Sequence, residues 1–299
     1  MKLTINDFMP TERKCLSLFR QLRWPSGVVC PLCSSKHVVN NGRHRATMHC
    51  RYLCKSCRRF FTDTTGTIFE RSQLTMREWF YIARELQRNR SINQIANELG
   101  RDYKIVMRAA HRILQNAFAQ RFFGTLSGEV EGDEMYHPAG EKGTKQTGRP
   151  ARKRGLRAWG SGWDRDKPPI VVLVERGGNA AISVVRRLTD ETISALGRFH
   201  IGHKTQRLDT DGWRGYDVLE QSVRHEKVIH SAGQYALYGV HNNTCEGINS
   251  LLRHWLNTFR GICKENLGYF VALFEFNYNR RFLAPMERFL QLLMGMISH

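Results

Sequence analysis

Two close pairs of cysteines constrain the fold of this chain more than any other feature. The pairs are Cys30-Pro-Leu-Cys33 and Cys54-Lys-Ser-Cys57, and residues 34–53 separate them. Two residues between the thiols of each pair is the spacing of a tetrahedral zinc site, in which two tight turns each supply two thiolates. We therefore predict a zinc ribbon in residues 1–70, with a structural Zn²⁺ held by Cys30, Cys33, Cys54 and Cys57.

The cysteines also allow other interpretations. Two disulfides would need an oxidising compartment, whereas the polar residues 1–7 lack the apolar segment of a secretory signal. A coincidence of spacing and a redox role are further alternatives. Cys50 is close enough to Cys54 in sequence to compete as a ligand. We expect a cytoplasmic, bacterial, nucleoid-associated protein, and we expect Cys15, Cys245 and Cys263 to be small buried apolar residues.

The charge of the chain indicates a polyanionic partner. It has 46 Lys and Arg against 27 Asp and Glu, a formal net charge of +19 and a pI near 10.0. Neutralising phosphates is the main source of non-specific affinity for nucleic acid, so DNA or RNA is the favoured partner. An anionic membrane surface is the weaker alternative. No apolar run approaches the roughly 18 residues of a membrane span, and we expect no membrane partner.

Residues 74–116 have the pattern of three helices. Trp79, Ile82, Ala83 and Leu86 recur at the spacing of an amphipathic helix, and Ser91 and Gly100 have the character of an N-cap and a stop for the next one. This pattern favours a helix-turn-helix over residues 71–122, with a generic helical bundle as the alternative. The side chains expected to face outward and contact DNA are Lys104, Arg108 and His111.

Residues 123–299 have a different pattern, in which strands alternate with helices. Residues 129–136, 170–175 and 207–211 read as strands, residues 189–196 read as a helix, and the sequence after Asn243 is helical. This order predicts an α/β or mixed domain. The stretch 137–168 is strongly basic and contains Gly148-Arg149-Pro150, so Arg149 and Arg152 are candidate DNA contacts, with a solvated loop as the alternative.

Three acidic residues in this part could form a metal site. Asp133 lies in a strand, Asp211 at the end of a later strand, and Glu246 at the start of a helix. Carboxylates from separate elements can converge on two divalent ions about 4 Å apart, which is the arrangement used in phosphoryl transfer. The expected ions are Mg²⁺ or Mn²⁺.

Each acid also has a structural alternative. Asp133 could lie on a solvated edge strand, Asp211-Gly212 could be a turn, and Glu246 could close a capping box with Asn243. The helix after Asn243 is expected to bury Ile248, Leu251, Leu252 and Trp255. Glu246 then falls on the opposite side with Arg253, which would point toward a DNA substrate.

The sequence resembles insertion-sequence transposases of the DDE class, in the subgroup with an N-terminal zinc ribbon. The matching segments run from about residue 10 to 285 and comprise Cys30-Pro-Leu-Cys33, Thr64-Thr65-Gly66-Thr67-Ile68-Phe69, Glu131-Gly132-Asp133-Glu134, Thr210-Asp211-Gly212-Trp213, His241-Asn242-Asn243-Thr244-Cys245-Glu246 and Phe276-Asn277-Tyr278-Asn279-Arg280-Arg281. Arg253-His254 stands where the family has Lys-Arg, and the loop after Asp133 is longer and more basic than expected.

The resemblance implies an RNase H-like catalytic domain in residues 123–299. It assigns the catalytic metal-ligand roles to Asp133, Asp211 and Glu246, and it implies cleavage and strand transfer at terminal inverted repeats. The expected partner is double-stranded DNA, with a homo-oligomer assembled on it. Two alternatives are a non-catalytic DNA-binding regulator and a nuclease built on the same core.

Overall fold

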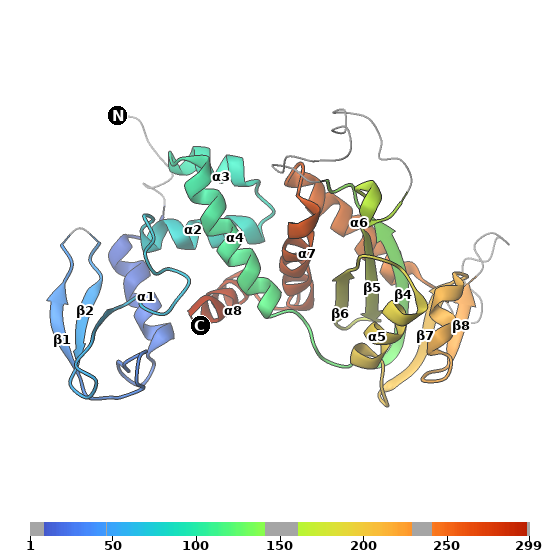
Figure 1. Cartoon of the computed structure of the whole chain (residues 1–299), viewed down its shortest axis with the longest axis horizontal. Helices are drawn as coiled ribbons and strands as arrows, with labels where there is room; N and C mark the ends of the chain where they lie inside the picture. The colour runs from blue at the N-terminus through green and yellow to red at the C-terminus, as the bar shows by residue number, and fades with distance from the viewer. Residues whose placement is uncertain (1–8, 46, 141–160, 229–240, 298–299) are drawn as a thin grey trace. The chain divides into compact units, whose positions relative to one another are not determined.

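The computed structural model describes residues 9–45, 47–140, 161–228 and 241–297. The chain forms two compact units, shown in Figure 1. The first unit comprises residues 1–117 together with 283–299, and the second comprises residues 118–282. Each unit is described by itself.

A small antiparallel sheet forms the ribbon of the first unit. Its strands, in spatial order, are β1 (Val38–Arg43), β2 (Cys50–Cys54) and β3 (Phe60–Thr62). Tyr52 and Phe61 pair across β2 and β3 and stack with ring centroids 5.2 Å apart. The buried Asp63 carboxylate accepts bonds from Arg20, from the Cys50 N–H and from Tyr52. Because Arg20 lies on α1 (Glu12–Arg23), this carboxylate links the ribbon to a helix.

Four further helices complete the first unit: α2 (Met76–Gln87), α3 (Ile92–Leu99), α4 (Tyr103–Ala119) and α8 (Pro285–Ile297). The three helices predicted in residues 74–116 are confirmed. Ser91 caps α3 in a capping box with Gln94, and Gly100 ends that helix in the left-handed conformation. The predicted domain of residues 123–299 differs from the structure at its end, because α8 packs on α1 and α2.

A five-stranded mixed sheet forms the second unit. Its spatial order is β6-β5-β4-β7-β8, where the strands are β4 (Gly128–Tyr136), β5 (Pro169–Glu175), β6 (Ala180–Val184), β7 (Thr205–Asp211) and β8 (His225–Val228). β4 runs parallel to β7 and antiparallel to β5, and β7 runs parallel to β8. β4 is therefore central, and the edge-strand alternative for Asp133 is wrong.

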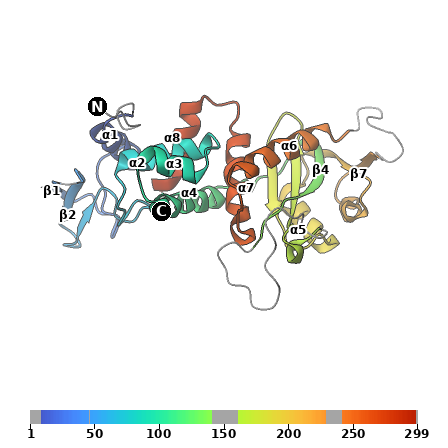
Figure 2. The ribbon, with the colours of Figure 1, turned by 90° about the horizontal axis from the view of Figure 1, so that it is seen from above.

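Helices cover both faces of this sheet, as Figure 2 shows. One face packs its apolar side chains on α5 (Asp190–His200) and on the short helix η3 (Arg214–Leu219). The other face lies under α6 (Asn243–Thr258), and α7 (Lys264–Asn279) packs against β6. Gly132 allows close packing in β4, because a Cβ there would lie 3.2 Å from Leu173 and from Thr210.

Side chains of α7 seal the edge strand β6. Asn279 accepts a bond from the Ala180 N–H at 2.7 Å and donates to the Ala180 carbonyl at 2.9 Å. Glu275 accepts a bond from the Ile182 N–H at 2.7 Å. These contacts give the closing Asn-Tyr-Asn-Arg-Arg segment a structural role, because an unsealed edge strand would be free to pair with another chain.

Among the described residues, no helix combines the length and the apolar character needed to cross a membrane.

Candidate functional site

The four predicted zinc ligands lie together in the ribbon. Their sulfur atoms are all within 4.8 Å of one another, and the Cys30–Cys57 and Cys33–Cys54 sulfur pairs are 3.8 and 3.6 Å apart. Four thiolates at about 2.3 Å from a tetrahedral Zn²⁺ would be separated by about 3.8 Å. The donor set and its spacing therefore fit a structural zinc ion.

Matching turns build the two halves of this cluster. The residue after each second cysteine, Ser34 or Arg58, has a positive φ of 59° or 57°. This left-handed conformation turns the chain back so that backbone N–H groups point at sulfur. The Cys57 N–H lowers the pKa of the Cys54 thiol to about 6. Against an opposing backbone hydrogen bond, burial and hydrogen bonds with the neighbouring thiols raise the pKa of the Cys33 thiol in the same cluster. A metal cation bound by all four sulfurs would stabilise the thiolate form of each.

Cys50 is not part of the cluster. It is buried in the ribbon core with Tyr52 and Phe61, and its N–H bonds Asp63. Cys15 and Cys245 are buried, as expected, and Cys263 is only partly buried.

The adjacent parallel strands β4 and β7 carry Asp133 and Asp211 at the end of their pairing. Gly132 of β4 pairs with Thr210 of β7, and each aspartate is the next residue along its strand. The Asp211 Oδ1 accepts a bond from the Trp213 N–H at 3.1 Å, so Asp211 also starts a turn. The predicted turn and the predicted site residue are therefore compatible with one another.

A buried carboxylate, Glu131, fixes the start of α6 against β4. It accepts bonds from the N–H groups of Thr244 and Cys245 at 2.7 and 3.0 Å and from the Thr244 hydroxyl at 2.9 Å. Arg176 pairs with it at 2.7 Å and also with Asp209 at 2.6 Å. The alternative of a capping box between Asn243 and Glu246 is wrong, because the N-cap is Asn242 and it makes no side-chain cap bond.

One turn further along α6, Asn249 contacts Asp133. The Asn249 Nδ2 donates to the Asp133 Oδ2 at 2.7 Å, and the Glu134 N–H donates to the Asp133 Oδ1 at 2.8 Å. Asn249 is 4% exposed, and its Oδ1 is buried with no hydrogen-bond partner. Five residues of helix span about 7.5 Å, and two residues of strand span about 6.6 Å. The distance along α6 from Thr244 to Asn249 is therefore close to the distance along β4 from Glu131 to Asp133, the two residues that they contact.

The three predicted acids influence one another electrostatically. Burial, together with the charges of Asp211 and Glu246, raises the pKa of Asp133 to about 6, against the opposing hydrogen bonds from the Glu134 N–H and Asn249. Burial followed by the charges of Asp211 and Asp133 likewise raises the pKa of Glu134 to about 7. A divalent cation would relieve this repulsion.

Among the described residues, three or more metal-binding side chains bring their ligand atoms within 4.8 Å of one another at two places. One is the cysteine cluster. The other is Asp217, Glu220 and His225, where the Lys227 ammonium already lies 2.8 and 3.0 Å from the two carboxylates. The oxygens of Asp133, Asp211 and Glu246 are more widely spaced. Two ions about 4 Å apart can accept ligand oxygens up to about 8 Å apart, which is a wider spacing than ligands of a single ion have.

Sequence reasoning missed Asn249 and the role of Glu131. It predicted that Leu251 is buried, which is wrong, because Leu251 is 57% exposed. At about 100° per residue, the buried apolar residues Cys245, Ile248, Leu252, Trp255 and Leu256 span an arc of about 100°. Leu251 lies about 40° beyond one end of this arc and Asn249 about 20° beyond the other. Both residues therefore flank the buried face, and residue type alone favoured the wrong one.

The candidate DNA contacts have different environments. Lys104, Arg108 and Arg253 are exposed, whereas His111 is half-buried and burial lowers its pKa. Arg253 lies near the end of β4, because its charge contributes to lowering the pKa of the buried His137 to about 4, after burial itself. Arg149 and Arg152 lie outside the described residues.

Two family models match the chain at the places where these sites lie. The ISXO2-like transposase domain matches residues 125–279, and the transposase zinc-ribbon domain matches residues 10–59. The first match covers more than half of the chain and contains all three acids. The second contains all four clustered cysteines. The chain therefore belongs to the family of insertion-sequence transposases with an ISXO2-like transposase domain and an N-terminal zinc ribbon.

A relative and two solved structures were also compared. The chain is 38% identical over 273 residues to an uncharacterized protein in transposable element ISH50 of Halobacterium salinarum, covering 89% of this chain and 90% of the relative. A pre-cleavage Mos1 transpososome is 14% identical with a TM-score of 0.25, covering 74% of this chain and 80% of that one. The Mos1 strand transfer complex is 14% identical with a TM-score of 0.23, and the match covers 68% of this chain and 76% of that one. TM-scores of this size do not establish a shared fold.

Proposed function

We propose that this protein is a DNA transposase that binds the terminal inverted repeats of an insertion sequence and catalyses metal-dependent cleavage and strand transfer. The observation that supports the proposal is that Asp133 and Asp211 follow the last residue pair between two adjacent parallel strands, while Glu246 lies in the exposed first turn of α6. Asp211 and Glu246 raise the pKa of the Asp133 carboxyl group through their charges, and Asn249 holds it in place.

The catalytic domain is proposed to be RNase H-like. Three consecutive strands in antiparallel order, with the first strand also parallel to the fourth, support this assignment. In such a sheet the first and fourth strands run side by side, and Asp133 and Asp211 directly follow Gly132 and Thr210, the last residue pair that joins them.

Asp133, Asp211 and Glu246 would hold two Mg²⁺ or Mn²⁺ ions. When bound, such ions activate the attacking oxygen and stabilise the leaving one. Asn249 and the Glu134 N–H orient the Asp133 carboxylate by bonding one oxygen each. Glu131 fixes the first turn of α6, the turn that contains Glu246, through the N–H groups of Thr244 and Cys245. Arg253, two turns further along α6, would bind a substrate phosphate.

The first unit would supply DNA recognition. The cysteine cluster holds the ribbon through Zn²⁺, and helices α2, α3 and α4 form the proposed helix-turn-helix. The left-handed Gly100 between α3 and α4 gives the short turn that such a motif needs. Lys104 and Arg108 lie on the exposed side of α4, where a recognition helix would contact DNA.

Purified protein incubated with the flanking ends of its own genomic locus tests the proposal. The proposal predicts cleavage in Mg²⁺ or Mn²⁺ that releases a 3′-hydroxyl, followed by joining of that end to target DNA. Binding without cleavage under any divalent ion would instead identify a regulator. Cleavage without joining would identify a nuclease on the same core.

A further inference from the structure

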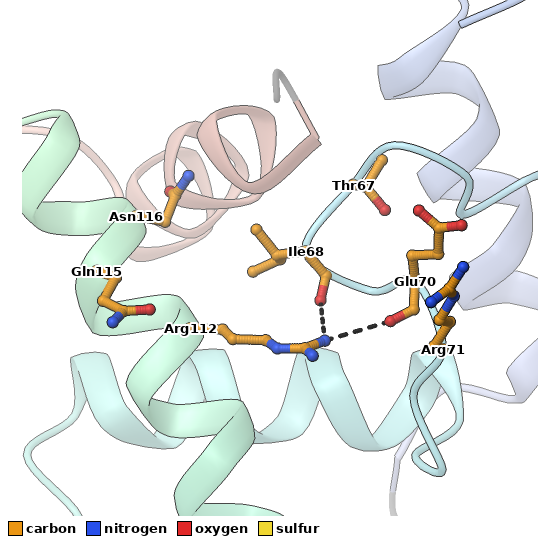
Figure 3. A pocket seen from close by; sticks show the side chains of 7 residues that line it. All are labelled: Thr67, Ile68, Glu70, Arg71, Arg112, Gln115 and Asn116. Atoms are coloured by element: carbon orange, nitrogen blue, oxygen red, sulfur yellow. Dashed lines mark hydrogen bonds between the residues drawn. The ribbon is translucent and has the colours of Figure 1, made fainter. Parts of the chain in front are cut away.

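The first unit contains a charged feature of its own. A hollow of about 160 Å³ separates the segment before α2 from the side of α4. Its lining includes Arg71, Arg108 and Arg112, with the polar side chains of Ser72 and Gln73 and no carboxylate. A wider hollow of about 520 Å³ shares Arg71 and Arg112 with it and is shown in Figure 3.

Some arginines of this unit are neutralised by a nearby carboxylate, and no carboxylate in the part of the chain that the structure describes does this for the three of this hollow. Arg20, Arg88 and Arg101 each pair with a carboxylate. Among the described residues, Arg71, Arg108 and Arg112 form no ion pair. The carboxylate that lines the wider hollow, Glu70, accepts a bond from the Gly66 N–H at 2.9 Å. Three cations around one hollow repel one another, so the arrangement favours an anionic partner.

Hydrogen bonds to backbone carbonyls hold the side chains of Arg108 and Arg112 in place. Arg112 donates through one nitrogen to the carbonyls of Ile68 and Glu70, at 2.9 and 3.3 Å (Figure 3). Arg108 donates through Nε to the Lys104 carbonyl at 3.2 Å. Each guanidinium has five N–H donors, so both keep donors for a ligand. Arg108 and Arg112 are also four residues apart, a spacing that places like charges on the same helix face.

Arg71 adds a separate observation. Its φ is 54°, a left-handed conformation that L residues other than Asn and Asp adopt at a cost. Glycine would be favoured at this position if only the turn mattered. Strained backbone of this kind is found at functional sites.

We infer that Arg71, Arg108 and Arg112 bind the sugar-phosphate backbone of duplex DNA in this hollow, beside the exposed side of α4. This inference rests on the proposed function, because DNA is the partner it assumes. It assigns phosphate binding to Arg71 and Arg112, which extend the predicted set of Lys104, Arg108 and His111. Phosphate contacts position a protein on DNA without reading sequence, so a duplex of arbitrary sequence is a sufficient probe.

Arg71→Gly is the most informative variant. It removes the guanidinium and also relieves the left-handed backbone, so the folded protein should be at least as stable as wild type. Arg108→Ala removes a second exposed guanidinium of the same hollow. The control is Arg13→Ala, which removes an equally exposed arginine from α1. Melting temperatures of all variants establish that each one is folded.

Fluorescence anisotropy of a labelled DNA duplex, measured over a range of KCl concentrations with the full chain, gives affinity and its salt dependence. Each lost phosphate contact should weaken binding about fivefold and reduce the slope of log K against log[salt] by about 0.9. The control should keep the wild-type slope. Wild-type affinity and slope in Arg71→Gly and Arg108→Ala would overturn the inference, as would absence of duplex binding by the wild-type protein.

The outcome is separable from that of the proposed function. If the carboxylates prove not to support cleavage while the arginine variants lose salt-dependent binding, the phosphate site stands and the proposed chemistry falls. If cleavage depends on the carboxylates while the arginine variants bind normally, only the phosphate site is rejected.

Discussion

At the scale of single residues, Asn249 has the clearest consequence for the proposed reaction. It donates the 2.7 Å bond that orients Asp133, and no other described side chain takes that role. Asn249→Ala should lower the cleavage rate about 10- to 100-fold, because partners of metal ligands typically have effects of this size. The Mg²⁺ concentration for half-maximal cleavage should rise at the same time, and duplex DNA binding should not change.

Asn257→Ala is the matched control for Asn249, because Asn257 lies on the exposed side of the same helix. An Asn249→Ala protein with the wild-type rate and the wild-type Mg²⁺ requirement would contradict the positioning role.

Glu275 should make the stability of the second unit depend on pH. Burial raises its pKa from 4.5 to about 7, against the opposing bonds from Phe122 and Ile182 and the charges of Arg121 and Arg280. The folded state therefore binds a proton more tightly than the unfolded state. Glu275 therefore contributes up to about 3 kcal/mol to the free energy of unfolding below pH 4.5, and this contribution is lost as the pH rises from 4.5 to about 7.

Glu275→Gln removes this titration and provides the test. The variant is expected to be less stable at about pH 5 by about 1–3 kcal/mol, because its amide can accept only one of the two backbone bonds. Its urea midpoint should change less than that of wild type between about pH 5 and pH 8. Parallel pH profiles for the two proteins would show that Glu275 titrates normally.

At the scale of elements, the position of α6 depends on a carboxylate from another element. Glu131→Gln would weaken the cap on Thr244 and Cys245 and leave Arg176 with less countercharge. Breaking a buried ion pair costs about 3–5 kcal/mol, and amide hydrogen exchange in residues 243–258 should accelerate accordingly. Glu129→Gln serves as the comparison, since the Glu129 side chain is 42% exposed and its pairs should contribute less than about 1 kcal/mol. Equal exchange in both variants would argue against the cap.

An element could be predicted from the sequence when the residues that determine it lie within its own segment. Helices α2, α3 and α4 were predictable because their apolar spacing and the cap at Ser91 lie within the segments themselves. The cysteine cluster was predictable because both cysteine pairs have the same spacing, with two residues between the thiols. The sequence did not predict β6 or β8, both of which are short strands at the edges of the sheet.

The candidate active site shows the same limit. Asp133, Asp211 and Glu246 were proposed as site residues from residue type and from their place within elements, both of which can be read from sequence. The cap that Glu131 forms on α6 joins two residues, Glu131 and Thr244, that are 113 positions apart in sequence. No local sequence pattern specifies such a contact. Leu251 was misassigned because its apolar character was given more weight than its angular position on α6.

At the scale of the whole molecule, the ribbon should depend on metal and the second unit should not depend on that metal. The ribbon core contains five buried side chains, of which three are cysteines. A core of this size cannot fold a sheet alone, and structural zinc supplies on the order of 10 kcal/mol of binding free energy. Cys30→Ser or Cys57→Ser should abolish end recognition and leave the carboxylate site intact.

Hydrogen exchange of the full chain measures both effects at once. Residues 38–62 should lose protection in the cysteine variants, and residues 128–136 and 205–211 should keep it. A cysteine variant that binds its ends with normal affinity would contradict the structural role of the cluster.

The central claim is that Asp133 and Asp211 support metal-dependent DNA cleavage, and one assay tests it directly. Asp133→Ala and Asp211→Ala proteins, shown to be folded and able to bind DNA, are incubated with element ends in Mg²⁺ or Mn²⁺. We predict that neither variant releases a 3′-hydroxyl end, whereas the wild-type protein does. Cleavage at the wild-type rate by either folded variant would contradict the assignment of the active site.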